Sequence, residues 1–358
     1  MSGMTQDKQL DTRADFLAAA GWADARAVPL AGDASTRRYE RLDRRGQSAI
    51  FMIAPPSAEA PSCPLDADEV TRKALGYNAM ARLAGPNLNA FVAMANALRV
   101  AGISAPEIYA ADPANGYALI EDLGDDLFAR VVGRVDEETL YQNAIDALLT
   151  LHKKSLTRPV DETFAMLDYD GLALDAETRL LMEWYWPLKY SAEASDDIYT
   201  DYHARWASVL DGLSAPHTFV LRDYHAENLL WLPEREGAAK VGVIDFQDAL
   251  FGQAAYDLVS LLEDARRDVS PDLADKMVAY YLDQSDCDPV QFERDYAILA
   301  TQRNAKILGI FARLAKRDNK PRYLDLLPRV EAHFRRDLAR PAMAPLVPFF
   351  EKHFPELV

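Results

Sequence analysis

The segment Leu221–Asn228 reads LRDYHAEN, and the segment Val243–Asp248 reads VIDFQD. The first places a carboxylate, Asp223, five positions before an amide, Asn228, between two apolar stretches that are typical of short strands. The second ends an apolar strand with another carboxylate, Asp245. Loops at strand ends hold polar side chains in shared sites while their apolar neighbours anchor the backbone.

These oxygen-bearing side chains suit phosphoryl transfer to a hydroxyl group. That reaction needs an acceptor hydroxyl held in line with the phosphate and a metal ion that neutralises the phosphates. We expect Asp223 to orient the hydroxyl and accept its proton, and Asn228 and Asp245 to bind Mg²⁺, which prefers oxygen ligands. ATP is the expected donor. For each residue taken alone, a turn or helix-capping role is the alternative.

Composition and charge exclude several classes of function. The chain has 358 residues, enough for about two domains or lobes, and a formal net charge of −17. A negative field of this size repels a phosphate backbone, so we expect no nucleic-acid partner. It also means that a phosphate-bearing ligand must be bound by local positive charge or by a metal ion.

The sequence also predicts a cytoplasmic protein without a membrane partner. No apolar run approaches the ~20 residues that span a bilayer, and Met1–Arg13 lacks the apolar stretch of a signal peptide. Cys63 and Cys287 are too few for a disulfide framework and lack metal-ligand spacing. The oligomeric state stays open.

The N-terminal third alternates short apolar strands with turns, and the remainder is mostly helical. We expect a β-rich N-terminal lobe over residues 1–121, a hinge near 121–124, and a helical C-terminal lobe over 122–358. The expected strands are Ala25–Leu30, Arg37–Leu42, Ser48–Ile53, Glu107–Ala111, Tyr117–Ile120, Thr218–Leu221, Leu229–Leu232 and Lys240–Ile244. The expected helices are Thr12–Ala20, Asp68–Leu83, Asn89–Val100, Glu137–Lys153, Asp175–Tyr190, Tyr202–Leu213, Tyr256–Arg266, Ser270–Asp283, Val290–Arg317 and Tyr323–Arg340. The fold class is therefore α+β.

The motifs resemble those of the aminoglycoside phosphotransferase and choline kinase-like family. The family's catalytic loop is roughly H-x-D-x-H-x-x-N and its metal motif is I-D-F or I-D-W, which match Asp223–Asn228 and Ile244–Phe246. A downstream Y-D-L element matches Tyr256–Leu258. The resemblance implies a protein-kinase-like, two-lobed fold with a nucleotide-binding N-terminal lobe, whose hinge, with Glu121 and Leu123, contacts the nucleotide.

The sequence is also similar to a narrower group, bacterial kinases that phosphorylate the anomeric hydroxyl of N-acetylmuramate and N-acetylglucosamine during peptidoglycan recycling. The matching stretches are Gly32–Tyr39, Ala54–Pro56, Asp245–Ala249, Tyr256–Leu262, Ile307–Leu314 and Lys320–Tyr323. This resemblance implies an amino-sugar substrate and a sugar 1-phosphate product.

Three positions depart from the family pattern. Leu221 stands where the catalytic-loop histidine is expected, the third strand has no lysine, and the helix Asn89–Val100 has no partner glutamate. We expect Arg37 or Arg38 to reach the phosphates instead, with loop amides near Gly32 and Ser35.

Two residues are candidates for substrate binding. His225 either contacts substrate or phosphate, or packs inside its loop. Arg313 either binds an anionic sugar or belongs to a solvated helix face.

Two other functions remain possible from the sequence. An aminoglycoside or other small-molecule kinase of the same fold would suit the acidic surface, because aminoglycosides are polycationic. A non-catalytic, kinase-like binding module would account for the missing lysine.

Overall fold

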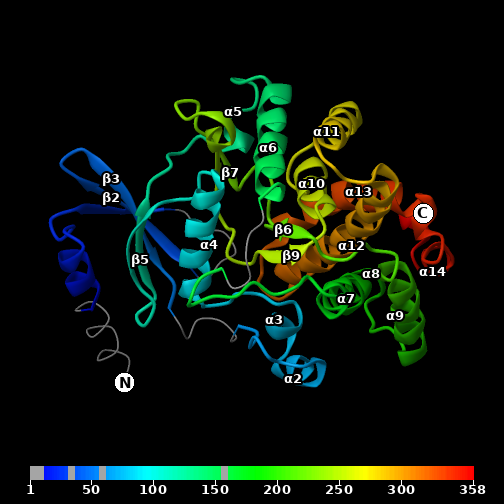
Figure 1. The fold of residues 1–358 in the computed structure, drawn as a ribbon. Coiled ribbons are helices and arrows are strands. Elements are labelled where there is room, and N and C mark those ends of the chain that lie inside the picture. Colours follow the sequence, from blue (N-terminus) through cyan, green and yellow to red (C-terminus); the bar gives the residue numbers. More distant parts are fainter. Residues whose placement is uncertain (1–11, 31–36, 56–61, 155–159) are drawn as a thin grey trace.

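The computed structural model describes residues 12–30, 37–55, 62–154 and 160–358. A small antiparallel sheet lies on one side and a larger group of helices on the other, with α4 (Leu88–Ala101) between them (Figure 1). The expected α+β class and two-lobed arrangement are therefore confirmed. Within the described ranges, every helix is too short or too polar to span a lipid bilayer.

Five strands form the N-terminal sheet in the order β1-β2-β3-β5-β4, and all neighbours are antiparallel. They are β1 (Arg26–Pro29), β2 (Arg38–Arg44), β3 (Gln47–Ile53), β4 (Ile108–Asp112) and β5 (Tyr117–Glu121). Arg45 and Gly46 join β2 to β3 with φ of 54° and 81°. Two positive φ angles in a two-residue turn give the strand twist that a hairpin needs.

The alternation of side chains along β3 decides what covers each face of the sheet. Ala49 and Phe51 are buried in a small apolar cluster with Leu17, from the helical residues 12–19. Ile50 and Met52 point to the opposite face and pack into the main core with residues of α4. The central strand is thus buried on both faces.

The helix predicted over Asp68–Leu83 is broken in the structure. It consists of α2 (Glu69–Leu75) and α3 (Tyr77–Met80), separated at Gly76. Gly76 has a φ of 93°, a conformation that side-chain-bearing residues rarely adopt. The prediction was wrong because the chain turns sharply at this glycine.

This α2–α3 segment packs on the helical lobe beside α7 (Gly171–Leu180), away from the sheet (Figure 1). Nη2 of Arg72 donates to Oδ1 of Asp170 at 3.0 Å, and Nη2 of Arg82 lies 3.0 Å from Oδ2 of the same carboxylate. Asp170 also caps the first turn of α7. A segment connected to the N-terminal sheet therefore lines the C-terminal lobe.

The C-terminal lobe is built mainly from helices. Those in the described ranges, besides short 3₁₀ turns, are α5 (Phe128–Val131), α6 (Glu137–His152), α7, α8 (Trp186–Tyr190), α9 (Asp196–Leu210), α10 (Ala255–Leu262), α11 (Pro271–Gln284), α12 (Pro289–Lys316), α13 (Leu327–Leu338) and α14 (Val347–His353). The helix predicted over 175–190 contains a π-helical turn, Leu181–Tyr185, and α14 was not predicted.

Two short antiparallel pairs lie among these helices. β6 (Thr218–Val220) pairs with β9 (Leu250–Gly252), and β7 (Leu229–Trp231) pairs with β8 (Val241–Val243). The segment 221–228 joins β6 to β7, and the segment 244–249 joins β8 to β9. Both loops that carry the candidate residues are thus held at each end by a strand.

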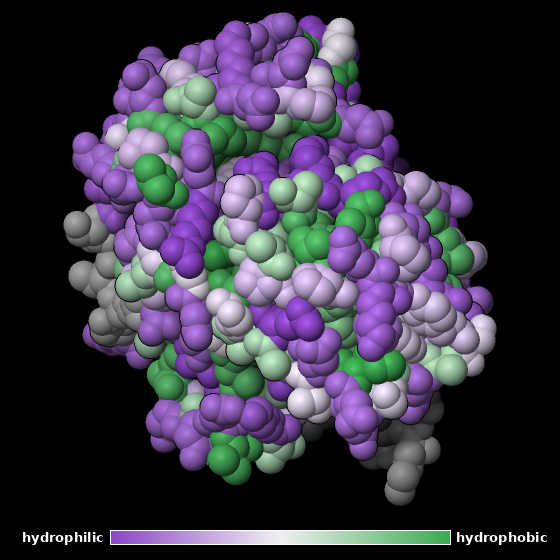
Figure 2. All heavy atoms as spheres, turned by 90° about the vertical axis from the view of Figure 1, so that its right-hand side faces the viewer, coloured by the Kyte–Doolittle hydropathy of each residue, from purple (hydrophilic) through white to green (hydrophobic). Residues whose placement is uncertain are grey.

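The main apolar core is continuous across the two lobes. It runs from Ile50 and Met52 of the sheet through α4 to α6 and α10. A second cluster surrounds α12 with residues of α9, α13 and α14. The surface near these C-terminal helices is mostly hydrophilic, with apolar side chains in small patches (Figure 2).

Gly309 allows α12 to approach the end of α7 closely. A Cβ atom at this position would lie 2.2 Å from the backbone carbon of Leu180 and 2.3 Å from its oxygen. Backbone atoms at such distances cannot be displaced without moving a helix. The glycine in the family-like stretch Ile307–Leu314 therefore serves helix packing.

We predict that Gly309→Ala lowers the free energy of unfolding by about 3 kcal/mol, the upper end of overpacking costs. Gly171→Ala is the matched control, because a Cβ at Gly171 meets nothing within 4 Å. Chemical denaturation of both variants measures the effect. Equal stability of the two variants would contradict the role given to Gly309.

Candidate active site

A buried carboxylate fixes the backbone of the catalytic loop at its start. Oδ2 of Asp257, on α10, accepts a hydrogen bond from the backbone N–H of Leu221 at 2.7 Å, and Oδ1 accepts one from Arg222 at 2.9 Å. Asp257 is fully buried, and burial raises its pKa to about 7 against the opposing effect of these two donors. The predicted Y-D-L element therefore supports the loop.

Arg222 turns the chain toward Asp223. Its φ is 71°, in the left-handed region that costs energy for a residue with a side chain. The buried guanidinium pairs with Glu177, and its Nη1 donates to the carbonyl of Ala81 at 3.2 Å. These contacts and the Asp257 bonds hold a conformation that the isolated loop would not favour.

Asn228 is oriented by the backbone of Asp223. Nδ2 of Asn228 donates to the carbonyl oxygen of Asp223 at 3.0 Å. A carbonyl oxygen only accepts hydrogen bonds, so the amide nitrogen must face it and the amide oxygen is directed elsewhere. This orientation leaves Oδ1 available as a metal ligand.

Asp245 follows β8 with a φ of 61°, a left-handed conformation that aspartate tolerates better than most residues. Protein atoms surround its carboxylate, yet 48% of the side chain remains accessible. Oδ1 accepts a hydrogen bond from Nε2 of Gln247 at 2.8 Å. Burial and the nearby negative charge of Asp223 raise the pKa of Asp245 to about 6.

Asp223 experiences the opposite balance of charges. Burial opposes its ionisation, but the positive charges of Lys306 and Arg303 on α12 lower its pKa. Asp223 is therefore ionised at neutral pH, as a proton acceptor must be.

The donor set fits a divalent metal ion. The mutual repulsion of Asp223 and Asp245 is the kind that a bound cation relieves, and the free amide oxygen of Asn228 adds a neutral ligand. The described ranges contain no group of three or more His, Cys, Asp or Glu side chains placed to hold a metal. The site offers one carboxylate and one amide, which leaves room for phosphate oxygens and water around Mg²⁺.

Of the two arginines proposed for phosphate binding, Arg37 lies beside the metal loop. Its Nη1 is 3.9 Å from Oδ1 of Asp245, and its side chain is 9% exposed. Nη2 donates to the carbonyl oxygen of Gly85 at 3.0 Å. Arg38 is exposed at the start of β2. Gly32 and Ser35 lie outside the described residues.

The hinge residues are tied to their surroundings by side chains. Glu121 forms ion pairs with Arg99, at 3.4 Å, and with Arg235 of the C-terminal lobe. Leu123 packs over Gly242 of β8: a Cβ atom added to Gly242 would lie 3.3 Å from Cδ1 of Leu123. Their contact with a nucleotide remains a prediction.

The two candidate substrate residues occupy different surroundings. His225 is buried, and burial lowers its pKa to about 4, so its ring is neutral at pH 7. Its Nε2 lies 3.4 Å from Nδ2 of Asn228, which favours the packing alternative for this residue. Arg313 is half-buried on α12, with its Cζ 5.6 Å from the centre of the Tyr77 ring.

Sequence reasoning missed a buried charge cluster beneath the catalytic loop. Glu177 on α7 is fully buried and pairs with both Arg222 and Lys306, the latter at 2.9 Å. Tyr169 and Gln302 donate further hydrogen bonds to its carboxylate. A single glutamate in a helical pattern gives no sign of partners 45 and 129 positions away in the chain.

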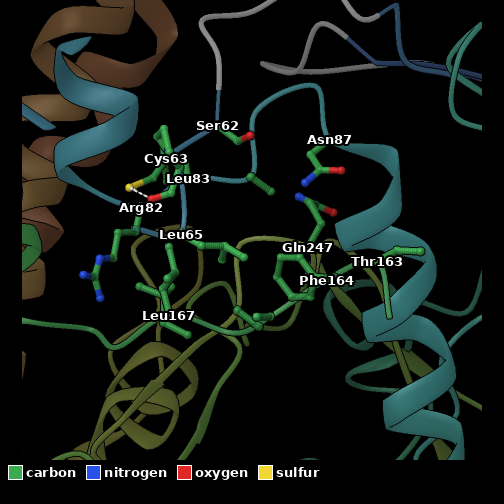
Figure 3. Close-up of a pocket in the computed structure, with 15 residues that line it drawn as sticks. Ser62, Cys63, Leu65, Arg82, Leu83, Asn87, Thr163, Phe164, Leu167 and Gln247 are labelled. Carbon is green, nitrogen blue, oxygen red and sulfur yellow. Dashed lines mark hydrogen bonds between the residues drawn. The ribbon is translucent and has the colours of Figure 1, made fainter. Parts of the chain in front are cut away.

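A pocket of about 210 Å³ opens beside the loop that carries Asp245 (Figure 3). Its walls come from residues 62–65, 82–87, 163–167 and 247–250. The side-chain amides of Asn87 and Gln247 lie close together at one end, and Arg82 points away from them (Figure 3). Through Gln247 the pocket shares a residue with the environment of Asp245.

A family model described as "Phosphotransferase enzyme family" matches residues 26–297. The chain belongs to this family. An N-acetylmuramate/N-acetylglucosamine kinase of Caulobacter vibrioides is 46% identical over 352 residues, covering 96% of each chain. A choline/ethanolamine kinase family protein of Mesorhizobium loti has the same fold, with a TM-score of 0.57, 14% identity, and coverage of 96% of this chain and 99% of that chain.

A third similar structure is a thermostable mutant of an aminoglycoside phosphotransferase in a ternary complex with ADP and hygromycin B. It has a TM-score of 0.52, 11% identity, and coverage of 90% of this chain and 97% of that chain. The predicted family, the protein-kinase-like fold and the assignment as an ATP-using phosphotransferase are confirmed. The roles of individual site residues remain predictions.

We predict that Glu177→Gln lowers the free energy of unfolding by about 3 kcal/mol at pH 7, because two buried cations lose their shared carboxylate. The pKa of Glu177, despite the opposing effect of burial, is lowered to about 2 by Lys306 and Arg222, from an ordinary value of 4.5. The stabilisation is therefore present above pH 4.5 and is lost as the pH falls toward 2.

Denaturation of wild type and variant across this pH range measures the difference. Glu69→Gln is the control, because this exposed glutamate pairs with Lys73 one turn away in α2. A Glu177 variant as stable as the control at pH 7 would contradict the prediction.

Proposed function

We propose that the protein is an ATP- and Mg²⁺-dependent kinase that phosphorylates the anomeric hydroxyl of N-acetylmuramate and N-acetylglucosamine. The observation that carries the proposal is the 46% identity, over 96% of both chains, to a kinase of that name. The arrangement of Asp223, Asn228 and Asp245 supports it, because the predicted base and both predicted metal ligands are present and close together.

Asp223 acts on the acceptor sugar. Its carboxylate accepts a hydrogen bond from the anomeric hydroxyl and takes its proton as the oxygen attacks the γ-phosphorus of ATP. ADP leaves, and the product is a sugar 1-phosphate. Lys306 and Arg303 keep Asp223 ionised before the proton is transferred.

Asn228 and Asp245 would hold the metal ion. When bound, Mg²⁺ neutralises charge on the triphosphate that the acidic protein would otherwise repel. Gln247 orients the Asp245 carboxylate through its hydrogen bond at 2.8 Å. The Asp223 carbonyl orients the Asn228 amide in the same way.

The N-terminal lobe, residues 1–121, binds the nucleotide in this proposal. Arg37 supplies positive charge next to the metal loop in place of the missing third-strand lysine, and its short distance to Asp245 supports this role over Arg38. Arg41 of β2 pairs with Asp122 and Asp125, each at 2.8 Å, and so holds the hinge against the sheet. Because the activity would require ATP, we propose a cytoplasmic location.

We predict that Asp223→Asn lowers kcat for N-acetylmuramate by about 10²- to 10⁴-fold while ATP still binds. Glu227→Gln is the matched control: it removes an acid from the same loop, but Glu227 is exposed and lies 3.1 Å from Arg266. Transfer of labelled phosphate from ATP and calorimetric ATP binding provide the two measurements. Normal turnover by Asp223→Asn would rule out its role as the base.

The same labelled ATP tests the acceptor against kanamycin and choline. Phosphorylation of kanamycin alone would replace the proposal with an aminoglycoside kinase, which the net charge of −17 would suit. Magnesium-dependent ATP binding without transfer to any acceptor would indicate a binding module.

We predict that Arg37→Ala raises the KM for ATP about tenfold, because one charge-assisted phosphate contact is lost. Arg38→Ala, which removes an equal charge from the neighbouring exposed position, should leave the KM near the wild-type value. Steady-state kinetics at saturating sugar measure both. A larger effect of Arg38→Ala would reverse the assignment.

A further inference from the structure

In addition to Arg303, which acts on Asp223, α12 carries two cations on one face, Lys306 and Arg313. They are seven residues apart, which places them on the same helix face about 10 Å apart along the axis. Lys306 lies near enough to Asp223 to lower its pKa. Side chains of an α-helix lean toward its N-terminus, so Arg313 extends back toward Lys306.

The two cations differ in how their charge is balanced. Lys306 pairs with Glu177 at 2.9 Å and donates to the hydroxyl of Tyr256 at 3.3 Å. The Arg313 side chain forms no hydrogen bond or ion pair with any residue in the described ranges, and its Nε is buried without a partner. Burial without a paired acid lowers its pKa.

Neighbouring acids do not neutralise Arg313. Asp318, which influences it electrostatically, is already bound by Arg317 at 2.7 Å. Glu183 also acts on Arg313 without forming a contact within ion-pair distance. A half-buried guanidinium without its own acid is costly unless a ligand supplies the negative charge.

The Arg313 side chain is linked to the catalytic loop through α3. Its Cζ lies 5.6 Å from the ring centre of Tyr77, at the start of that helix. One turn later, the carbonyl of Ala81 accepts a hydrogen bond from Arg222, the residue before Asp223. The ring that Arg313 contacts is thus one helical turn from a carbonyl that is bonded to the catalytic loop.

The two proposed substrates differ in one charged group. N-acetylmuramate carries a lactyl ether, with a carboxylate, on the ring carbon two positions from the anomeric one, whereas N-acetylglucosamine has a hydroxyl there. With the anomeric oxygen at Asp223, this carboxylate projects away from the reacting atoms. A guanidinium binds a carboxylate through two parallel hydrogen bonds, which a hydroxyl cannot reproduce.

We infer that Arg313 binds the carboxylate of N-acetylmuramate and so sets the preference for this sugar over N-acetylglucosamine. This inference rests on the proposed function. Arg313 is a specificity-determining residue that does not touch the reacting atoms, and its loss should affect binding of one sugar only.

The test compares both sugars in wild type and Arg313→Gln. The KM for N-acetylmuramate should rise roughly ten- to hundredfold, the value of a hydrogen-bonded charge pair, with little change in kcat. The kinetics with N-acetylglucosamine should stay within about twofold of wild type. Lys316→Gln, which removes an exposed positive charge from the last residue of α12, is the control and should change the kinetics with neither sugar.

A second measurement compares N-acetylmuramate with its methyl ester, and the part done on the wild-type protein does not depend on a folded variant. In the wild type, the KM for the ester should exceed the KM for the acid by the same factor that Arg313→Gln causes. In the Arg313→Gln variant, the KM values for ester and acid should be equal. If Arg313→Gln raised the KM for both sugars equally, or left the ratio of the two KM values unchanged, the inference would be overturned and the kinase assignment would stand. Failure of the wild type to phosphorylate either sugar would overturn both.

Discussion

The carboxylate of Asp257 binds the backbone N–H groups of Leu221 and Arg222, and the position of the proposed base depends on these two hydrogen bonds. Asp257 is fully buried, so removal of either partner would leave an unsatisfied polar group in the core. The left-handed conformation of Arg222 is held from the other side by Glu177. Buried contacts with α7 and α10 thus stabilise a strained backbone conformation at Arg222. Asp223, the next residue, is half-exposed.

Local charges explain how a protein with a net charge of −17 can bind a triphosphate. Lys306 and Arg303 lie on one side of Asp223, and Arg37 lies beside Asp245. The two carboxylates repel each other, which raises the pKa of Asp245 on top of the effect of burial. A divalent ion held by Asp245 and Asn228 would reduce this repulsion and would supply positive charge for the phosphates. The same surroundings leave Arg313 as a cation for an anionic acceptor.

Sequence patterns predicted the features that depend on local chemistry. The apolar strand β3 and the amphipathic helix α6 lie within one or two residues of their expected limits, and Asp223, Asn228 and Asp245 gather as their strand-end positions indicated. The features that the sequence did not predict depend on contacts between residues that are far apart in the chain. Pairing of β9 with β6 needs the whole lobe, and Glu177 gains its role only from partners on other elements. The sequence shows a glycine at position 76, but it does not show that the chain turns there with a positive φ angle.

The central claim is that Asn228 and Asp245 hold a metal ion while Asp223 faces the acceptor hydroxyl. A crystal structure with Mg²⁺, a non-hydrolysable ATP analogue and N-acetylmuramate tests it most directly. We expect the Asn228 amide oxygen and the Asp245 carboxylate about 2.1 Å from Mg²⁺, and the anomeric oxygen within hydrogen-bond distance of Asp223. A metal ion bound by other residues, or a sugar whose anomeric oxygen lies away from Asp223, would contradict the account.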